Sequence, residues 1–197
     1  MSRRARRSIL YDGCYAHVFS RSIEKRYIFK NGKHFEKFYQ LLQQAKKEYG
    51  FRIFHYCLMH THFHLAIGIG DLERFSAGMK WLKWKYTKIY NDKRKRRGTV
   101  WQGRFNSLVI EDERYLKACG IYIEQNPVEA GIVRRALEWK YSSHGYHELG
   151  HKDDLVDSYE WGGTLPEVRG DFKTFFEKGP VIGSSIFDFY FREMNPV

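Results

Sequence analysis

Two histidines separated by one residue are the part of this sequence best suited to bind a cation. His62 and His64 flank Phe63 in a stretch rich in aromatic and β-branched residues, which favours a strand over a helix. Alternate side chains of a strand point to the same face, so the two imidazoles should project together while Phe63 enters the core. Such a pair can hold one divalent cation, although a single histidine in a strand is more often a satisfied polar group.

A predicted helix over residues 113–126 carries two further polar groups. It should end near Asn126, because Pro127 disfavours helical geometry in the residue before it. Tyr122 and Asn126 are one helical turn apart, which brings their Cβ atoms to about 5–6 Å from each other. The buried face of the helix should consist of residues at helical spacing, namely Leu116, Cys119 and Ile123. If the turn bearing the phenol and the amide faces the histidine pair, the four side chains form one site.

These patterns resemble the single-tyrosine transposases of the His-hydrophobic-His class, and above all their REP-associated branch. The matching motifs are Met-x-x-His-x-His-Leu at 59–65, Trp-Gln-x-Arg at 101–104 and Tyr-Ile-x-x-Asn-Pro-Val-x-Ala-Gly at 122–131. Their ordered combination is far more specific than any one motif, and the resemblance extends over about residues 15–146. It implies a ferredoxin-like fold and single-stranded DNA near imperfect palindromes of the REP type as substrate. The implied metal ligands are His62, His64 and Asn126, and the implied nucleophile is Tyr122.

One departure from the family pattern lies beside the first histidine. Where Pro-Asn is expected, this chain has His60 and Thr61, and His60 would share the face of the histidine pair as a supporting group or an alternative ligand. Gln125 is a second ambiguity, because its side-chain amide could be the metal ligand in place of Asn126 if the helix frays. Tyr115 is the main rival nucleophile, but it lies about 10 Å from Tyr122 along the helix axis. A cation bound by Asn126 could not serve Tyr115, so the geometry favours Tyr122.

The expected cation is Mg²⁺ or Mn²⁺. Two imidazoles and an amide oxygen leave several coordination positions open, as an octahedral ion requires, and these positions can take oxygens of a scissile phosphate. Zinc is the alternative, but zinc hydrolases usually add a third histidine or a carboxylate. Attack by the Tyr122 phenol would form a 5′-phosphotyrosyl bond and release a 3′-hydroxyl. No general base can be chosen from the sequence.

The charge of the chain indicates a polyanionic partner. The net charge is +11, which divides into +15 for residues 1–150 and −4 for residues 151–197. This concentration of positive charge suits single-stranded or hairpin DNA, bound through phosphates with strong salt dependence. Trp81, Trp101 and Tyr141 are further candidate stacking faces, although aromatic residues are more often core. The candidate nucleic-acid contacts are Arg3, Arg4, Arg6, Arg7, Arg21, Arg26, Trp84, Lys93, Arg94, Lys95, Arg96, Arg97 and Arg104.

Periodicity and turn residues predict an α+β fold. Strands are expected over 14–20, 51–58, 62–69 and 104–110, and helices over 34–49, 71–91 and 113–126. The order β-α-β-β-α-β-α predicts an antiparallel sheet with two helices on one face, as in the ferredoxin-like fold. Asp71 is expected to cap the second helix, and Gly50 to end the first. A catalytic domain should span 1–150, followed by an acidic, aromatic-rich tail over 151–197 that packs on the domain, competes with DNA for the basic face or contacts a second subunit.

Other features limit the class of protein. No apolar run is long enough to span a membrane or to form a signal-peptide core, and three scattered cysteines indicate buried thiols in a reducing cytoplasm. The leading function is a bacterial DNA-cleaving and strand-transferring enzyme. Its rivals are a nucleic-acid-binding module without cleavage, and a metal-dependent RNA phosphodiesterase that uses water. The sequence leaves open whether the chain acts alone or as a homodimer.

Overall fold

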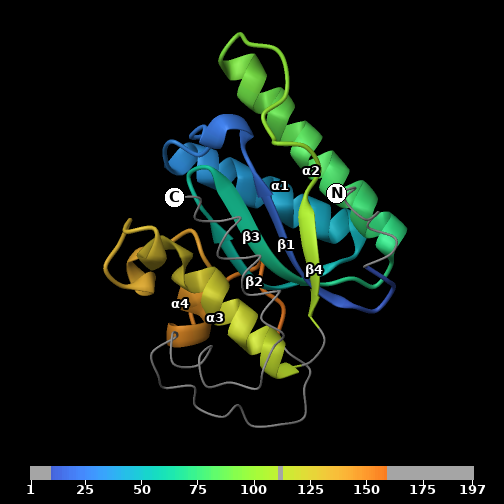
Figure 1. The fold of residues 1–197 in the computed structure, drawn as a ribbon, viewed down its shortest axis with the longest axis vertical. Helices are drawn as coiled ribbons and strands as arrows, with labels where there is room; N and C mark the ends of the chain where they lie inside the picture. The colour runs from blue at the N-terminus through green and yellow to red at the C-terminus, as the bar shows by residue number, and fades with distance from the viewer. Residues whose placement is uncertain (1–9, 111–112, 159–197) are drawn as a thin grey trace, which may run out of the picture. The chain divides into compact units, whose positions relative to one another are not determined.

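A four-stranded antiparallel sheet forms the centre of the structure, a computed structural model that describes residues 10–110 and 113–158 (Figure 1). The strands are β1 (Tyr15–Arg21), β2 (Arg52–Leu58), β3 (His62–Gly68) and β4 (Asn106–Ile110), in the spatial order β2-β3-β1-β4. β1 is central and pairs with both β3 and β4. Together with the helices, this order confirms the predicted α+β, ferredoxin-like fold.

Helices α1 (Gly32–Tyr49) and α2 (Leu72–Lys93) pack against each other on one face of the sheet. Their predicted ends are present: the Asp71 carboxylate accepts the Arg74 amide at 2.8 Å, and Gly50 ends α1 with a φ of 70°. Aromatic rings fill the space between these helices and the sheet. The buried rings include Phe29, Phe35, Phe38, Phe63, Tyr86 and Trp101.

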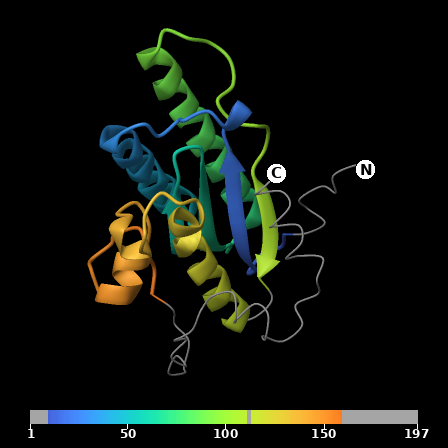
Figure 2. The ribbon, with the colours of Figure 1, turned by 60° about the vertical axis from the view of Figure 1, so that its left-hand side comes forward.

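Helix α3 (Glu113–Glu129) covers the opposite face, where it contacts β2 and β3 (Figures 1 and 2). Its buried residues include Leu116, Cys119 and Ile123, as predicted. The predicted end near Asn126 is wrong, because the helix continues through Pro127 to its last residue, Glu129. Proline removes one hydrogen bond of the helix. However, Pro127 is buried and the Ala130 amide donates to the Asn126 carbonyl at 3.0 Å, so packing and later hydrogen bonds carry the turn past it.

The chain after α3 returns to the β2 edge of the sheet through η3 (Ala136–Glu138) and α4 (His144–Leu149). The Leu58 amide donates to the Tyr141 carbonyl at 2.9 Å. Residues beyond the predicted boundary at 150 also pack here: Leu155 is fully buried, and the Asp153 carboxylate accepts the hydroxyls of Tyr39 and Tyr56. The rest of the predicted tail, residues 159–197, lies outside the described residues.

The helices and the cysteines of the described residues bear on two of the predictions about the class of protein. None of the helices in the described part of the chain is long and apolar enough to cross a membrane. Cys14, Cys57 and Cys119 are buried free thiols, as expected. Burial raises the pKa of each thiol, so all three stay protonated and unreactive at neutral pH.

Candidate active site

The sheet face under α3 brings the predicted histidine pair and the predicted tyrosine together. The ring centroids of His62 and His64 are 5.0 Å apart, and that of Tyr122 is 6.1 Å from that of His64. Phe63, between the histidines, points to the other face and packs against Phe38 of α1. The alternation of β3 and the position of α3 therefore create the group.

His17 of β1 belongs to this group and was not predicted from the sequence. Its Nε2 lies 2.9 Å from Nδ1 of His64, and both side chains are fully buried. The strand register explains the contact: Phe19 pairs with His64 and Arg21 with His62, so alternate residues of β1 share the face of the histidine pair. Nothing in the local pattern marks His17, and only the pairing of β1 with β3 could have revealed it.

Burial keeps these three imidazoles neutral. It lowers the pKa of His17 and of His62 to about 3, and it lowers the pKa of His64 well below the ordinary value. The positive charge of Arg21 acts in the same direction on both members of the pair. Neutral imidazole is the form that binds a metal ion.

Among the described residues, one buried nitrogen of the group has no hydrogen-bond partner. Nε2 of His64 is buried and makes no hydrogen bond within the described ranges 10–110 and 113–158. Buried polar atoms are nearly always paired, so this nitrogen is suited to a ligand from outside the chain. Nδ1 of His62 shares a hydrogen bond with the Thr61 hydroxyl at 2.8 Å, so its Nε2 is the nitrogen available for a ligand. The pair therefore fits the cation that the family resemblance implies.

Tyr122 and Asn126 occupy successive turns of α3. The Asn126 side-chain amide donates to the Tyr122 carbonyl at 2.9 Å, which fixes the orientation of that buried amide. Burial raises the pKa of the Tyr122 phenol above its ordinary value, while the Asn126 side chain and the Arg21 charge act in the opposite direction. The phenol is therefore protonated at neutral pH, and its use as a nucleophile requires help from a base or a cation.

The structure also places His60 and Gln125, the two alternative ligands considered from the sequence. His60 is not brought to the group: its Nδ1 is 2.7 Å from the Phe29 carbonyl oxygen, and its ring stacks on Tyr27 and meets Phe35 of α1 edge-on. It sits in the turn before β3, where strand alternation does not apply, and it faces the α1 side. Gln125 is only partly buried, whereas Asn126 is buried.

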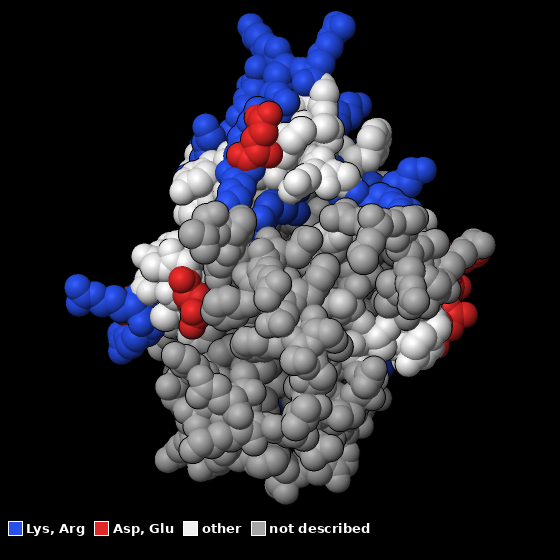
Figure 3. All heavy atoms as spheres, viewed as in Figure 1, with Lys and Arg blue, Asp and Glu red and all other residues white. Residues whose placement is uncertain are grey.

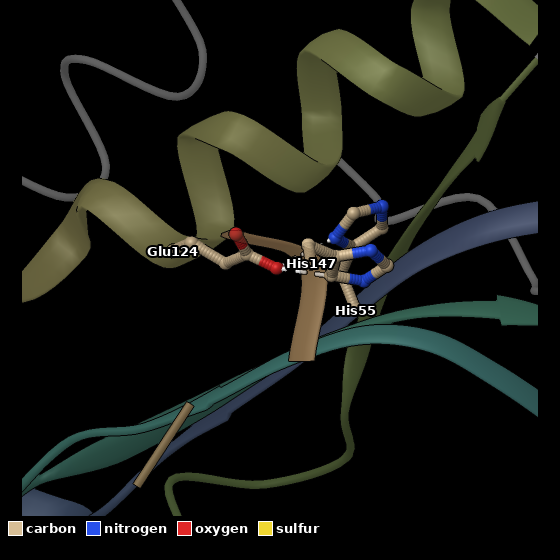
Figure 4. Close-up of side chains that lie close together, drawn as sticks. All are labelled: His55, Glu124 and His147. Atoms are coloured by element: carbon tan, nitrogen blue, oxygen red, sulfur yellow. Dashed lines mark hydrogen bonds and ion pairs between the residues drawn. The ribbon is translucent and has the colours of Figure 1, made fainter. Parts of the chain in front are cut away.

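A second group of ionisable side chains surrounds Glu124 of α3, and it was not predicted either (Figure 4). The buried carboxylate of Glu124 lies 2.7 Å from His55 Nδ1, 3.1 Å from His144 Nδ1 and 3.7 Å from His147 Nε2. The Ser143 hydroxyl donates to it at 2.6 Å. Ligand atoms of His55, Glu124 and His147 lie within 4.8 Å of one another, so these three residues could hold a metal ion.

Hydrogen bonds from neighbouring side chains stabilise the negative charge of the buried Glu124 carboxylate. Burial alone would raise the pKa of Glu124, but hydrogen bonds with His144 and His55 outweigh it, so the pKa is lowered. The hydrogen bond with Glu124 raises the pKa of His144, whereas burial lowers the pKa of His147. Gly120 leaves room for the arrangement, because a Cβ there would collide with the His55 ring. The carboxylate thus ties β2, α3 and α4 together.

Basic side chains gather where α2 ends, at the top of the view in Figure 1, and Figure 3 shows Lys and Arg side chains crowded over this end. Lys93, Lys95 and Arg97 of the predicted basic run are exposed, and Arg94 and Arg96 are partly exposed. Trp84 of α2 is 55% exposed. The end of α2 therefore presents cations and an aromatic face to solvent.

The remaining predicted nucleic-acid contacts are scattered. Arg21 stands opposite His62 in the sheet, Arg26 pairs with the exposed Glu24 at 3.2 Å, and Arg104 is exposed. The assignment of Trp101 as a stacking face is wrong, because its ring is buried in the core and its indole N–H donates to the Lys83 carbonyl at 3.1 Å. The predicted contacts near the N-terminus, Arg3, Arg4, Arg6 and Arg7, lie outside the described residues.

A ferredoxin-like sheet whose histidine pair faces a helix-borne tyrosine is the arrangement that the resemblance to single-tyrosine transposases implied. Residues 10–126 match the family described as "Transposase IS200 like". The chain therefore belongs to the IS200-like transposase family, a family of DNA-processing enzymes.

Two individual proteins are similar to this chain. The chain is 26% identical over 148 residues, 68% of its own length and 81% of the relative's, to a Haemophilus influenzae protein named "Putative REP-associated tyrosine transposase". A solved structure titled "Structure of the REP associates tyrosine transposase bound to a REP hairpin" has a TM-score of 0.65 and 19% identity, and the match covers 84% of this chain and 99% of that one. At that identity the likeness shows the fold alone.

Proposed function

We propose that this chain is a cation-dependent endonuclease and strand transferase that cleaves single-stranded DNA beside a hairpin, with Tyr122 as nucleophile. The observation that carries the proposal is the position of the Tyr122 ring beside His64, whose buried Nε2 has no partner in the described part of the chain. Membership of a transposase family supports DNA as the substrate. The REP hairpin named with the solved neighbour supports a hairpin as its form.

The proposed reaction exchanges one phosphate ester for another. The Tyr122 phenol oxygen forms a bond to phosphorus, and the bond from phosphorus to the 3′ oxygen breaks. The phenol loses its proton to a base or to solvent, and the 3′ oxygen takes up a proton, which leaves a 5′-phosphotyrosyl bond and a free 3′-hydroxyl. Because the covalent link keeps the energy of the phosphodiester, the strand can be joined to another 3′ end by the reverse reaction without ATP.

We assign the cation, Mg²⁺ or Mn²⁺, to His62, His64 and Asn126. When bound, such an ion would orient the scissile phosphate and polarise its phosphorus. Two neutral imidazoles and one amide oxygen suit this role because they leave positions open for phosphate oxygens. The Glu124 group suits it less, because Nε2 of His147 already shares a hydrogen bond with the Phe54 carbonyl at 2.9 Å.

One assay separates this proposal from its two rivals. Hairpin oligonucleotides with varied single-stranded flanks, labelled at the 3′ end, are incubated with the protein and Mn²⁺ or Mg²⁺ and then run on a denaturing protein gel. We expect label to migrate with the protein, and EDTA to prevent it. Cleavage without a labelled protein band would instead support a hydrolase that uses water, and a native-gel shift without cleavage would support a binding module.

Replacing His64 with alanine should separate cleavage from binding. Polarisation by a bound cation contributes several kcal/mol to such reactions, so cleavage should fall by about 1,000-fold. DNA affinity should stay within about threefold of wild type, because it arises mainly from charge. Initial cleavage rates and fluorescence-anisotropy titrations measure the two quantities, and His151→Ala, at an exposed histidine, is the control. A comparable loss of both in His64→Ala would contradict the assignment.

Removing positive charge from the end of α2 should weaken DNA binding and reduce its dependence on salt. The double variant Lys93→Ala/Arg97→Ala removes two exposed cations from the basic run. Each lost phosphate contact should reduce the slope of log affinity against log salt by about 0.7–0.9. Anisotropy titrations from 50 to 200 mM salt, conditions over which such affinities change strongly, measure the slope. The control Lys47→Ala/Lys152→Ala removes the same charge elsewhere, and equal slopes in the two variants would show that the α2 end does not contact DNA.

A further inference from the structure

We infer that His17 is a positioning residue for the cation site: its Nε2 accepts a hydrogen bond from Nδ1 of His64 and so directs the lone pair of His64 Nε2 toward the cation. This inference rests on the proposed function, because it concerns the cation assigned there to His62, His64 and Asn126. It adds to that site a residue from a different strand, β1, that lies outside the motifs that indicated the site.

The rings of His17 and His64 are within hydrogen-bond distance and are shielded from water. His17 Nε2 and His64 Nδ1 are 2.9 Å apart, and both side chains have no exposed surface. Phe19, which pairs with His64 across the strands, stacks on the His64 ring at 5.7 Å between centroids. Water therefore cannot replace His17 as the partner of Nδ1, and the His64 ring cannot turn without losing the hydrogen bond to His17.

Only one proton can lie between the two nitrogens, so two arrangements are conceivable. If His17 donates, Nδ1 of His64 is the acceptor, and the proton of the neutral His64 ring must be on Nε2. That places an N–H in a buried position without a partner in the described chain, and an N–H nitrogen cannot bind a cation. If His64 donates, its Nε2 instead carries a lone pair that a cation can satisfy. The orphaned nitrogen therefore favours donation by His64.

The identity of the partner has a consequence for the charge of the site. Histidines that bind metal ions usually donate their second N–H to a carboxylate, a carbonyl or water. Here the acceptor is a neutral imidazole, so ring orientation is fixed without adding negative charge. Two neutral histidines and a neutral amide leave the full charge of the cation facing the DNA phosphate, and the nearby Arg21 adds to it rather than opposing it. That balance suits an anionic substrate.

The decisive measurement is the Mn²⁺ affinity of the full chain by isothermal titration calorimetry. His17→Phe removes the acceptor and should weaken Mn²⁺ binding by about 10- to 100-fold, the usual effect of removing such a partner. His17→Gln places an amide oxygen near the former position of Nε2, so its Mn²⁺ affinity should stay near that of wild type, clearly above that of His17→Phe. Phe19→Leu, which alters packing on the same His64 ring without removing a hydrogen bond, is the matched control. A loss in Phe19→Leu or His17→Gln as large as in His17→Phe would overturn the inference.

A second measurement does not depend on the variants folding. Long-range ¹H–¹⁵N NMR of the wild-type protein without metal should show His64 with its proton on Nδ1, and a proton on Nε2 would overturn the inference. The two proposals can also fail separately. Wild-type protein whose Mn²⁺ binding is absent, or survives His64→Ala, overturns the cation site and this inference together. Binding that is lost in His64→Ala but unchanged in His17→Phe overturns only the role of His17.

Discussion

Tyr122→Phe is expected to abolish the covalent protein–DNA adduct while leaving the fold and the affinity for hairpin DNA unchanged. The change removes only the hydroxyl, which is the atom proposed to bond to phosphorus. The ring itself can keep its edge-on contacts with His17 and His64, whose centroids lie 6.0 and 6.1 Å away. Since the adduct requires that oxygen, the expected loss is complete rather than partial.

Tyr115→Phe is the matched control, because it removes a hydroxyl from another tyrosine of the same helix. It should form the adduct at the wild-type rate. The adduct is measured by transfer of 3′ label to protein on a denaturing gel, and peptide mapping of the wild-type adduct should find the DNA on Tyr122. Adduct formation by Tyr122→Phe, or its loss in Tyr115→Phe alone, would mean that a different residue is the nucleophile.

Glu124→Gln should cost about 3 kcal/mol of the free energy of unfolding. Glu124 is 4% exposed, and its carboxylate holds His55 of β2 together with Ser143 and His144 at the start of α4. Glutamine has nearly the same shape but no charge, and its N–H donors would replace one acceptor oxygen. Removing the charge of one partner from a buried ion pair typically lowers the free energy of unfolding by about 3–5 kcal/mol. The amide oxygen retains part of the hydrogen bonding, so we place the loss at the lower end.

Urea denaturation of the wild type and the variant measures this loss. Glu138→Gln is the control, because Glu138 pairs with Arg135 at the surface, where water and salt screen the attraction and such pairs contribute little to stability. A Glu124→Gln protein as stable as Glu138→Gln would show that the group does not hold β2, α3 and α4 together. Addition of EDTA to the His64→Ala variant, which lacks the cation site proposed above, tests whether His55, Glu124 and His147 hold a metal ion. Stabilisation by such an ion would make the midpoint of unfolding fall on chelation.

Much of the fold could be predicted because local patterns were strong. The alternation around His62 and His64 required a strand with one face in the core, and Asp71 and Gly50 marked helix ends through capping chemistry that involves only neighbouring residues. The succession of elements then left few topologies, and the ferredoxin-like order and the transposase family are both confirmed. Pro127 shows the limit of such rules, because burial and later hydrogen bonds outweighed its local preference.

By itself, the sequence determined which residues have chemistry suited to the proposed site and which elements carry them: a histidine pair on a strand, and a tyrosine and an asparagine one turn apart on a helix. Only the tertiary structure decided which partners these residues meet. His17 reaches His64 through the register of β1 with β3, and Glu124 meets His55 from β2 and both His144 and His147 from α4. Periodicity reports the face on which a side chain lies, but contacts between residues distant in the sequence depend on strand register and helix docking, which no short pattern encodes.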